Sequence, residues 1–216
     1  MATFTQSADV DTSATSIDVS LTGVAAGSLL VIATTRSSDI AGVADDDSNT
    51  WTKRSETTTG GVGEKGTVIY TAFAASSGDL TVTVTRTSGG GKAQVLLAEF
   101  AVAGAFESVD LATNVTSSGT AHNHGTVDVS GESVTIAASS QGNIDGSIDT
   151  EPSGYTRLTS AKNIAVWYRV GSTTISGNAS FTTSESIGAS SVHTAVLLAA
   201  SVTARTRRRQ STGVPL

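Results

Sequence analysis

The chain has 216 residues, with 13 Lys and Arg against 19 Asp and Glu residues, which gives a formal net charge of −6 at pH 7. The absence of cysteine excludes disulfides and cysteine-ligated metal sites. Charged residues make up only 15% of the chain and proline only two residues, whereas Gly, Ser, Thr, Ala and Val are abundant. Small and β-branched residues suit strands and tight turns and disfavour long helices, so the composition predicts an all-β protein.

The N-terminal sequence lacks the basic and apolar regions of a secretory signal peptide. No stretch approaches the ~18 consecutive apolar residues of a membrane-spanning helix. We therefore expect synthesis in the cytoplasm and no membrane partner.

The first part of the chain contains short runs that predict strands. Ser16–Leu21 alternates between polar and apolar residues, as a half-buried strand does. Ser28–Thr35 is almost continuously apolar, which is typical of a central strand buried on both faces. Residues 39–49 are predicted as a loop, and 50–54 as a strand that carries a buried Trp51.

The next segments predict a three-strand block. After a glycine-rich surface loop at 57–66, Val68–Arg86 predicts two strands joined by a hairpin turn at Ser76–Asp79. Ala93–Phe100 predicts the third strand. Residues 101–125 have no clear period and are predicted as the crossover between two halves.

The second half repeats the motifs of the first half in the same order. The matching pairs are Ser16–Ser20 with Thr126–Ser130, Gly27–Ala33 with Gly131–Ala138, Asp45–Lys53 with Asp149–Arg157, Ile69–Tyr70 with Trp167–Tyr168, and Leu96–Ala98 with Leu197–Ala199. This order predicts an internal duplication of a unit of about six strands, folded as an antiparallel, jelly-roll-like β-sandwich.

The predicted organisation is a β-sandwich over residues 1–204 with pseudo-repeats at about 14–103 and 124–203, followed by a basic arm at 205–216. Two packings of the repeats remain open. Each repeat could fold as its own small sandwich, or the two could pool their strands in one larger sandwich. We favour the pooled core, because each half has few large apolar side chains.

A family resemblance rests on the strand "Gly-Ser-Leu-Leu-Val-Ile", the turn "Asp-Asp-Ser-Asn-Thr-Trp-Thr" and the later "Leu-Leu-Ala-Glu-Phe". These motifs resemble a group of β-sandwich proteins of similar length found in phage virion modules and in some secreted bacterial proteins. The resemblance covers residues 16–103 well and the second half loosely. It departs from the group at Ser48, where the group usually has glycine, and it implies a structural module of a virion or surface.

The sequence offers weak candidate sites. Asp45, Asp46, Asp47 and Asn49 form a set of oxygen ligands that could hold Ca²⁺, but their spacing is not that of an EF-hand, and we expect acids that cap a turn. His122 and His124 could offer two imidazoles, yet no third ligand is visible, and we expect a polar loop there.

Catalytic motifs are absent from the sequence. There is no Gly-x-Ser-x-Gly nucleophile elbow, and Gly89–Lys92 lacks the spacing of a phosphate-binding loop. We therefore predict a protein that is not an enzyme and that has no cofactor.

The basic C-terminal arm is the strongest candidate for a functional segment of the chain. Residues 205–216 carry four of the 13 basic residues and no acidic one, so the rest of the chain holds nine basic against 19 acidic residues. We expect the arm to anchor the protein to an acidic protein surface rather than to a nucleic acid, because basic residues are sparse elsewhere. The predicted anchor residues are Arg205, Arg207, Arg208, Arg209, Val214 and Leu216.

These observations predict a virus-particle structural protein, most specifically a phage capsid decoration or cement protein located in the virion and assembled in the host cytoplasm. Its partners would be the major capsid protein or other virion proteins, and it would form a homo-oligomer, for which we expect a trimer. The alternatives are a tail, fibre or baseplate component, or a carbohydrate-binding surface module. The last would need exposed aromatic side chains, whereas Trp51, Tyr70, Trp167 and Tyr168 all lie in predicted buried strands.

Overall fold

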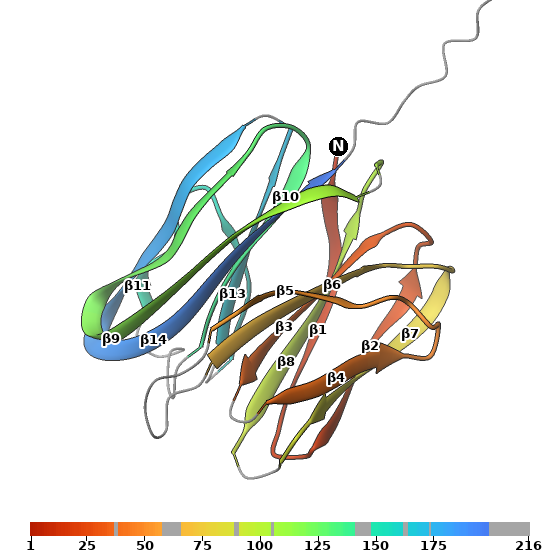
Figure 1. Cartoon of the computed structure of the whole chain (residues 1–216), viewed down its shortest axis with the longest axis horizontal. Helices are drawn as coiled ribbons and strands as arrows, with labels where there is room; N and C mark the ends of the chain where they lie inside the picture. Colours follow the sequence, from red (N-terminus) through yellow and green to blue (C-terminus); the bar gives the residue numbers. More distant parts are fainter. Residues whose placement is uncertain are drawn as a thin grey trace, which may run out of the picture.

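The computed structural model of the chain is an antiparallel β protein with two sandwiches packed against each other (Figure 1). It describes residues 1–36, 39–57, 66–88, 91–104, 106–140, 148–161, 164–172 and 174–198. No helix that could cross a membrane occurs among these residues. The predicted fold class, an all-β antiparallel sandwich, is confirmed.

The first sandwich comprises eight strands between residues 3 and 101. They are β1 (Thr3–Thr12), β2 (Ser16–Val24), β3 (Leu29–Arg36), β4 (Ile40–Asp45), β5 (Thr52–Glu56), β6 (Gly66–Phe73), β7 (Gly78–Arg86) and β8 (Ala93–Ala101). A five-stranded layer has the order β1-β8-β3-β6-β5, and a three-stranded layer has the order β2-β7-β4. Strand β3 lies at the centre of the larger layer, as the apolar run at Ser28–Thr35 predicted, and its residues 29–35 are buried.

The second sandwich comprises six strands between residues 106 and 198. They are β9 (Phe106–Val129), β10 (Ser133–Ser140), β11 (Ile148–Thr150), β12 (Thr156–Ala161), β13 (Ile164–Gly171) and β14 (Ile175–Leu198). The two longest, β9 and β14, have 24 residues each and pair with one another along both of their halves.

The β9–β14 ribbon folds over to supply both layers of the second sandwich (Figure 1). Residues 106–119 pair with 187–198, which continue through β10, β13 and β12 as the inner layer. Residues 121–129 pair with 175–182, which continue to β11 as the outer layer. With β9 and β14 divided in this way, the strand order in each layer is the same as in the first sandwich.

The sequence interpretation missed three strands. Strand β9 occupies most of the predicted crossover at 101–125, β4 lies within the predicted loop at 39–49, and β1 precedes the predicted first strand. Strands β1 and β9 are rich in Thr, Ser, Asn or Ala and carry no continuous apolar run, and β4 is a segment of only six residues, IAGVAD. Pairing with a neighbouring strand, rather than a local apolar period, makes them extended.

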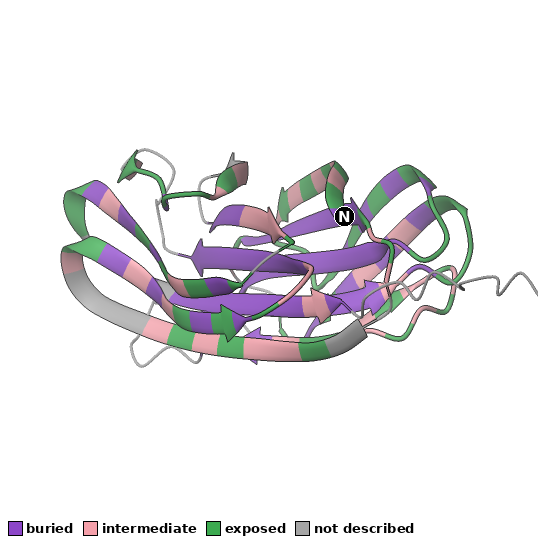
Figure 2. Ribbon diagram, turned by 90° about the horizontal axis from the view of Figure 1, so that it is seen from above, coloured by how far each residue is buried: buried purple, intermediate pink, exposed green. Residues whose placement is uncertain are grey.

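The two five-stranded layers face each other across one apolar core, and their central strands β3, β8 and β10 are buried along almost their whole length. Buried ribbons run through the middle of the molecule in Figure 2. Leu29 and Val31 of β3 and Phe100 of β8 pack in this core with Ile136 of β10 and Val196 of β14. Alternate residues of the same first-half strands face the three-stranded layer in a second core. This double burial explains the continuous apolar sequence of β3.

Polar and aromatic contacts join the two sandwiches at the edges of this core. The hydroxyl groups of Ser55 and Thr194 lie 2.8 Å apart, and the ring centroids of Phe4 and Tyr168 lie 5.1 Å apart in a stacked arrangement. No described strand of one sandwich pairs with a strand of the other. The halves therefore form separate hydrogen-bonded sandwiches that share an apolar core.

Candidate functional site

The acidic loop between β4 and β5 is organised by its own carboxylates. Asp45 Oδ1 accepts hydrogen bonds from the backbone N–H groups of Asp47 (3.1 Å) and Asn49 (2.9 Å), and its Oδ2 accepts one from the Trp51 indole N–H (2.6 Å). Asp47 Oδ2 accepts a hydrogen bond from the Ser76 hydroxyl at 2.7 Å. The carboxylates therefore tie the loop to itself and to the next hairpin.

Asp46 and Asn49, the remaining residues of the predicted calcium-ligand set, also accept hydrogen bonds from the backbone of neighbouring segments. Asp46 Oδ1 accepts from the Thr81 N–H at 3.0 Å, and Asn49 Oδ1 accepts from the Ala75 N–H at 2.7 Å. Among the residues that the structure describes, no group of three or more His, Asp or Glu side chains is placed to hold a metal ion. The arrangement matches the expected turn-capping role of these acids.

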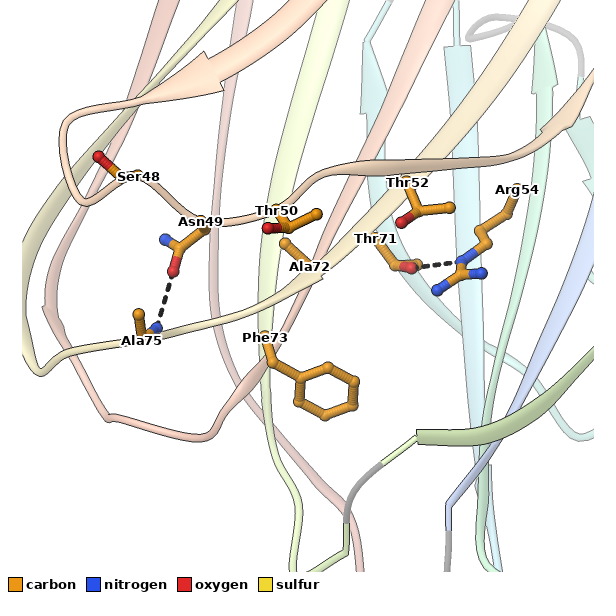
Figure 3. Close-up of a pocket in the computed structure, with 9 residues that line it drawn as sticks. All are labelled: Ser48, Asn49, Thr50, Thr52, Arg54, Thr71, Ala72, Phe73 and Ala75. Atoms are coloured by element: carbon orange, nitrogen blue, oxygen red, sulfur yellow. Dashed lines mark hydrogen bonds between the residues drawn. The ribbon is translucent and has the colours of Figure 1, made fainter.

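A surface pocket of about 350 Å³ lies beside this loop, at the edge formed by β5 and β6 (Figure 3). Ser48, Asn49 and Thr50 of the loop, Thr52 and Arg54 of β5, and Thr71, Ala72, Phe73 and Ala75 of β6 and the following turn line it. Thr71 Oγ1 accepts a hydrogen bond from Arg54 Nε at 2.7 Å, which holds the guanidinium against the sheet. Desolvation by burial lowers the pKa of Arg54. The pocket thus combines hydroxyl groups, an amide, a cation and one aromatic ring.

His122 and His124 occupy a different place from the one predicted. His122 and His124 lie on β9 and His193 on β14, and all three are buried between the inner and outer layers of the second sandwich. The prediction of a polar loop at His122–His124 is therefore wrong. The period-2 spacing of the two residues, which places both on the same face of a strand, was the signal available in the sequence.

Each imidazole is held by neutral partners. His124 Nδ1–H donates to the Ala179 carbonyl oxygen (2.6 Å), and its Nε2 lies 2.8 Å from the Ser139 hydroxyl, which lies 2.6 Å from that of Ser191. The Ser139–His124 pair has the distance of a nucleophile and its base. Ser139 and His124 are both buried, however, so the pair has no route to a substrate.

Burial sets the protonation of this cluster. Desolvation lowers the pKa of His124 to about 3, against a weaker opposing effect of its backbone hydrogen bond, and desolvation also lowers the pKa values of His122 and His193. Desolvation raises the pKa of Tyr155 to about 12, and its hydroxyl donates to His193 Nε2 at 2.7 Å. At neutral pH the cluster is therefore uncharged.

Two tryptophans occupy similar roles in the two sandwiches. The Trp51 indole N–H donates to Asp45, and the Trp167 indole N–H donates to Glu151. Trp167 and Tyr70 are buried, as predicted, whereas Trp51 and Tyr168 are half-buried and pack against the cores. Among the described residues, the large hydrophobic side chains that are exposed are Met1 and Leu111, and neither is aromatic.

The predicted anchor residues Arg205, Arg207, Arg208, Arg209, Val214 and Leu216 lie outside the residues that the structure describes. Comparison of the chain with protein-family models, with curated proteins and with solved structures finds no match.

Proposed function

We propose that the chain is a structural protein of a virus particle, of the phage capsid decoration or cement type. Such a protein binds assembled shell subunits better than loose ones and thereby stabilises the shell by mass action. The major capsid protein, or another virion protein, would be its partner.

The observation that carries this proposal is that the carboxylate and imidazole side chains, which could act in catalysis, make hydrogen bonds that hold the fold. Asp45 and Glu151 accept hydrogen bonds from tryptophan side chains, and the buried Glu99 accepts them from the Gln6 side chain and the Ala25 N–H. His124 is sealed between two sheet layers. A protein whose polar side chains hold its own fold is suited to a binding role rather than to catalysis.

Charge separation supports an anchoring role for the C-terminal arm. The arm carries four arginines and no acid, whereas the rest of the chain has ten more acidic than basic residues. Arginine binds carboxylates through paired, charge-assisted hydrogen bonds, so an acidic patch on a neighbouring virion protein is the surface we propose for it. Val214 and Leu216 would add apolar contacts at its end.

The test is co-sedimentation with assembled capsids that have been purified without this protein. Deletion of residues 205–216 should abolish binding, and replacing the four arginines by serine should weaken it strongly, whereas replacing them by lysine should weaken it less. Thermal melting provides the control, because each variant must unfold at the temperature of the unmodified protein. Full binding by the deletion variant would reject the arm as the anchor.

The oligomeric state is part of the proposal. A trimer would match a threefold position of a capsid lattice, and sedimentation equilibrium of the free protein would detect it. A tail, fibre or baseplate position is the alternative within the same class, and binding to purified tails instead of capsids would favour it.

A carbohydrate-binding role is a second candidate, and the pocket between β5 and β6 favours it. Its hydroxyl groups, the Asn49 amide and the Arg54 guanidinium can hydrogen-bond a saccharide, and Phe73 offers a ring for apolar contact. Binding on a glycan array that Phe73→Ala removes, and that Phe4→Ala retains because that ring lies elsewhere in the fold, would support this role.

We also propose that the two sandwiches arose by internal duplication. The same strand order in both supports this origin, as does the conserved order of the sequence motifs.

A further inference from the structure

All three histidines of the chain lie inside the second sandwich, between its two layers. Their relative exposures are 2% for His122 and 0% for His124 and His193. His122 stacks on Phe181 with ring centroids 4.8 Å apart, and the rings of His124 and Trp167 meet edge to face at 5.4 Å. The histidines thus form part of the packed interior of this sandwich.

Two of the histidines tie the layers together. His124, on the outer layer, binds the Ser139 hydroxyl of the inner layer at 2.8 Å. His193, on the inner layer, donates from Nδ1 to the Gly125 carbonyl oxygen of the outer layer at 2.8 Å. Two of the hydrogen bonds between the layers therefore pass through imidazole rings that can take up protons.

The first sandwich fills the corresponding space with apolar side chains. The cross-strand row Leu97, Ile32 and Tyr70 of its five-stranded layer faces the smaller layer. In the second sandwich the row that faces the smaller layer is His193, Ala137 and Trp167. Strand β2 contributes Val19 and Leu21 to the core of the first sandwich, whereas β9 contributes His122 and His124 to that of the second in addition to Val127 and Val129. The buried histidines are thus confined to one of two sandwiches with the same strand order.

The groups around the cluster do not neutralise three imidazolium ions. His122 lies 3.1 Å from the Thr183 hydroxyl, and His193 Nε2 accepts from Tyr155. Asp110 on β9 is the carboxylate with an electrostatic effect on His193, and it accepts the backbone N–H groups of Leu111 and Asp128.

The other charged groups near the cluster are engaged elsewhere or have the wrong sign. Glu151 accepts from Trp167 and Arg157, and Arg169 on β13 is a cation that acts on Tyr155. Within the described part of the chain, none of the hydrogen bonds to the three rings comes from a carboxylate.

We propose that the second sandwich is an acid-responsive unit, in which protonation of His122, His124 and His193 separates its outer layer from its inner layer while the first sandwich stays folded. A buried cation without a carboxylate partner is strongly unfavourable. Opening the layers exposes the rings to water and allows them to carry the charge.

The direction of the pH effect follows from linkage. Burial lowers the pKa of each histidine in the closed state, whereas an exposed histidine has a pKa of about 6.5. The opened state therefore binds protons first as the pH falls. The closed state is fully stable above about pH 6.5, and the opening constant rises by up to about tenfold per pH unit for each histidine below it.

The two tryptophans make the test possible in the full chain, because Trp167 lies beside His124 and Trp51 packs against the first core. The protein labelled with 5-fluorotryptophan should give one ¹⁹F resonance for each sandwich, and the Trp51→Phe variant assigns them. The Trp167 resonance should leave its native position between about pH 6.5 and pH 4.5, above the range in which ordinary Asp and Glu side chains titrate. The Trp51 resonance should stay. Loss of both resonances at the same pH, or of neither above pH 4.5, would overturn the proposal.

Two variants distinguish an effect of histidine charge from a general loss of stability. His124→Gln with His193→Gln should reduce the change in the opening constant between pH 7.5 and pH 5 by at least tenfold, whatever its effect at pH 7.5. Val82→Ala, in the first core, is the control and should show the same change in the opening constant between the two pH values as the unmodified protein. If the glutamine variant also shows the same change as the unmodified protein, the proposal is rejected.

If the glutamine variant does not fold, the pH titration of the imidazole Cε1–H resonances in the NMR spectrum of the unmodified protein tests the proposal instead. Titration of all three near pH 6.5 while the Trp167 resonance stays native would reject the proposal. Resonances that remain those of neutral rings until the Trp167 resonance changes would support it.

Discussion

At the scale of single residues, the loop between β4 and β5 contains the one described residue other than glycine that has a positive φ. Ser48 has φ 59°, a left-handed conformation that glycine adopts without the steric penalty of a Cβ atom.

We therefore expect Ser48→Gly to raise the free energy of unfolding by about 0.5–1 kcal/mol. Urea denaturation would measure the change. Thr50→Gly, two residues along at an exposed position without positive φ, is the matched control and should lower stability. A loss of stability in Ser48→Gly would contradict the assignment of backbone strain to this residue.

Asp45 is the residue on which the acidic loop depends. Asp45→Ala removes the acceptor of two backbone N–H groups and of the Trp51 indole, and we expect a loss of about 2–3 kcal/mol, measured by chemical denaturation. Asp45→Asn keeps one oxygen but turns an N–H₂ group toward one of these donors, so its loss should be smaller.

The same hydrogen bonds predict that the loop does not bind calcium. Because the carboxylates serve protein donors, the melting temperature should be the same in millimolar CaCl₂ and in EDTA. A calcium-dependent rise that Asp45→Ala abolishes would restore the metal-site hypothesis.

At the scale of elements, the folded β9–β14 ribbon depends on close contact between its own two halves. Gly125 has φ 82°, and a Cβ atom placed on it would lie 2.7 Å from the Cβ of Ala112. Strain and steric overlap therefore both oppose any other residue at this position.

Gly125→Ala should lower the free energy of unfolding by about 2–4 kcal/mol. Adding Ala112→Gly removes the overlap but not the strain of the positive φ, so the double variant should recover part of the loss. A double-mutant cycle by urea denaturation measures this coupling. Strict additivity of the two substitutions would contradict the contact between the two halves of the ribbon.

At the scale of the whole molecule, the first sandwich carries an apolar face that the second sandwich covers. Leu29, Val31, Leu96 and Phe100 contribute to it, and their exposures are all 0–1% in the full chain. A fragment of residues 1–102 would expose this face to water, and contiguous apolar patches of this kind drive association.

We expect this fragment to self-associate, as measured by analytical ultracentrifugation. The fragment with Val31→Lys and Leu96→Lys should associate less, because charge on the exposed face opposes contact. A stable monomer of the unmodified fragment would show that the shared core contributes little to holding the halves together.

Several features could be predicted from the sequence. The continuous apolar run of β3 identified a strand covered on both faces, and the turn at Ser76–Asp79 identified the start of β7. The acids Asp45–Asp47 were expected to cap a turn, and their hydrogen bonds do so. In each case the signal is local, because it lies in adjacent residues or in their alternation.

The features that only the tertiary structure could establish depend on contacts between residues that are distant in the chain. Strand β9 carries no apolar period over residues 106–119 and is extended because β14, about 80 residues later, supplies its hydrogen-bond partners. The same pairing carries His122 and His124 into the interior and brings them against His193. Sequence periodicity reports which face of a strand is apolar, whereas it cannot report that a ribbon folds over and buries a polar face against a second layer. The central apolar strands could thus be predicted from the sequence, whereas strand β9 and the buried histidine cluster depended on pairing between distant parts of the chain.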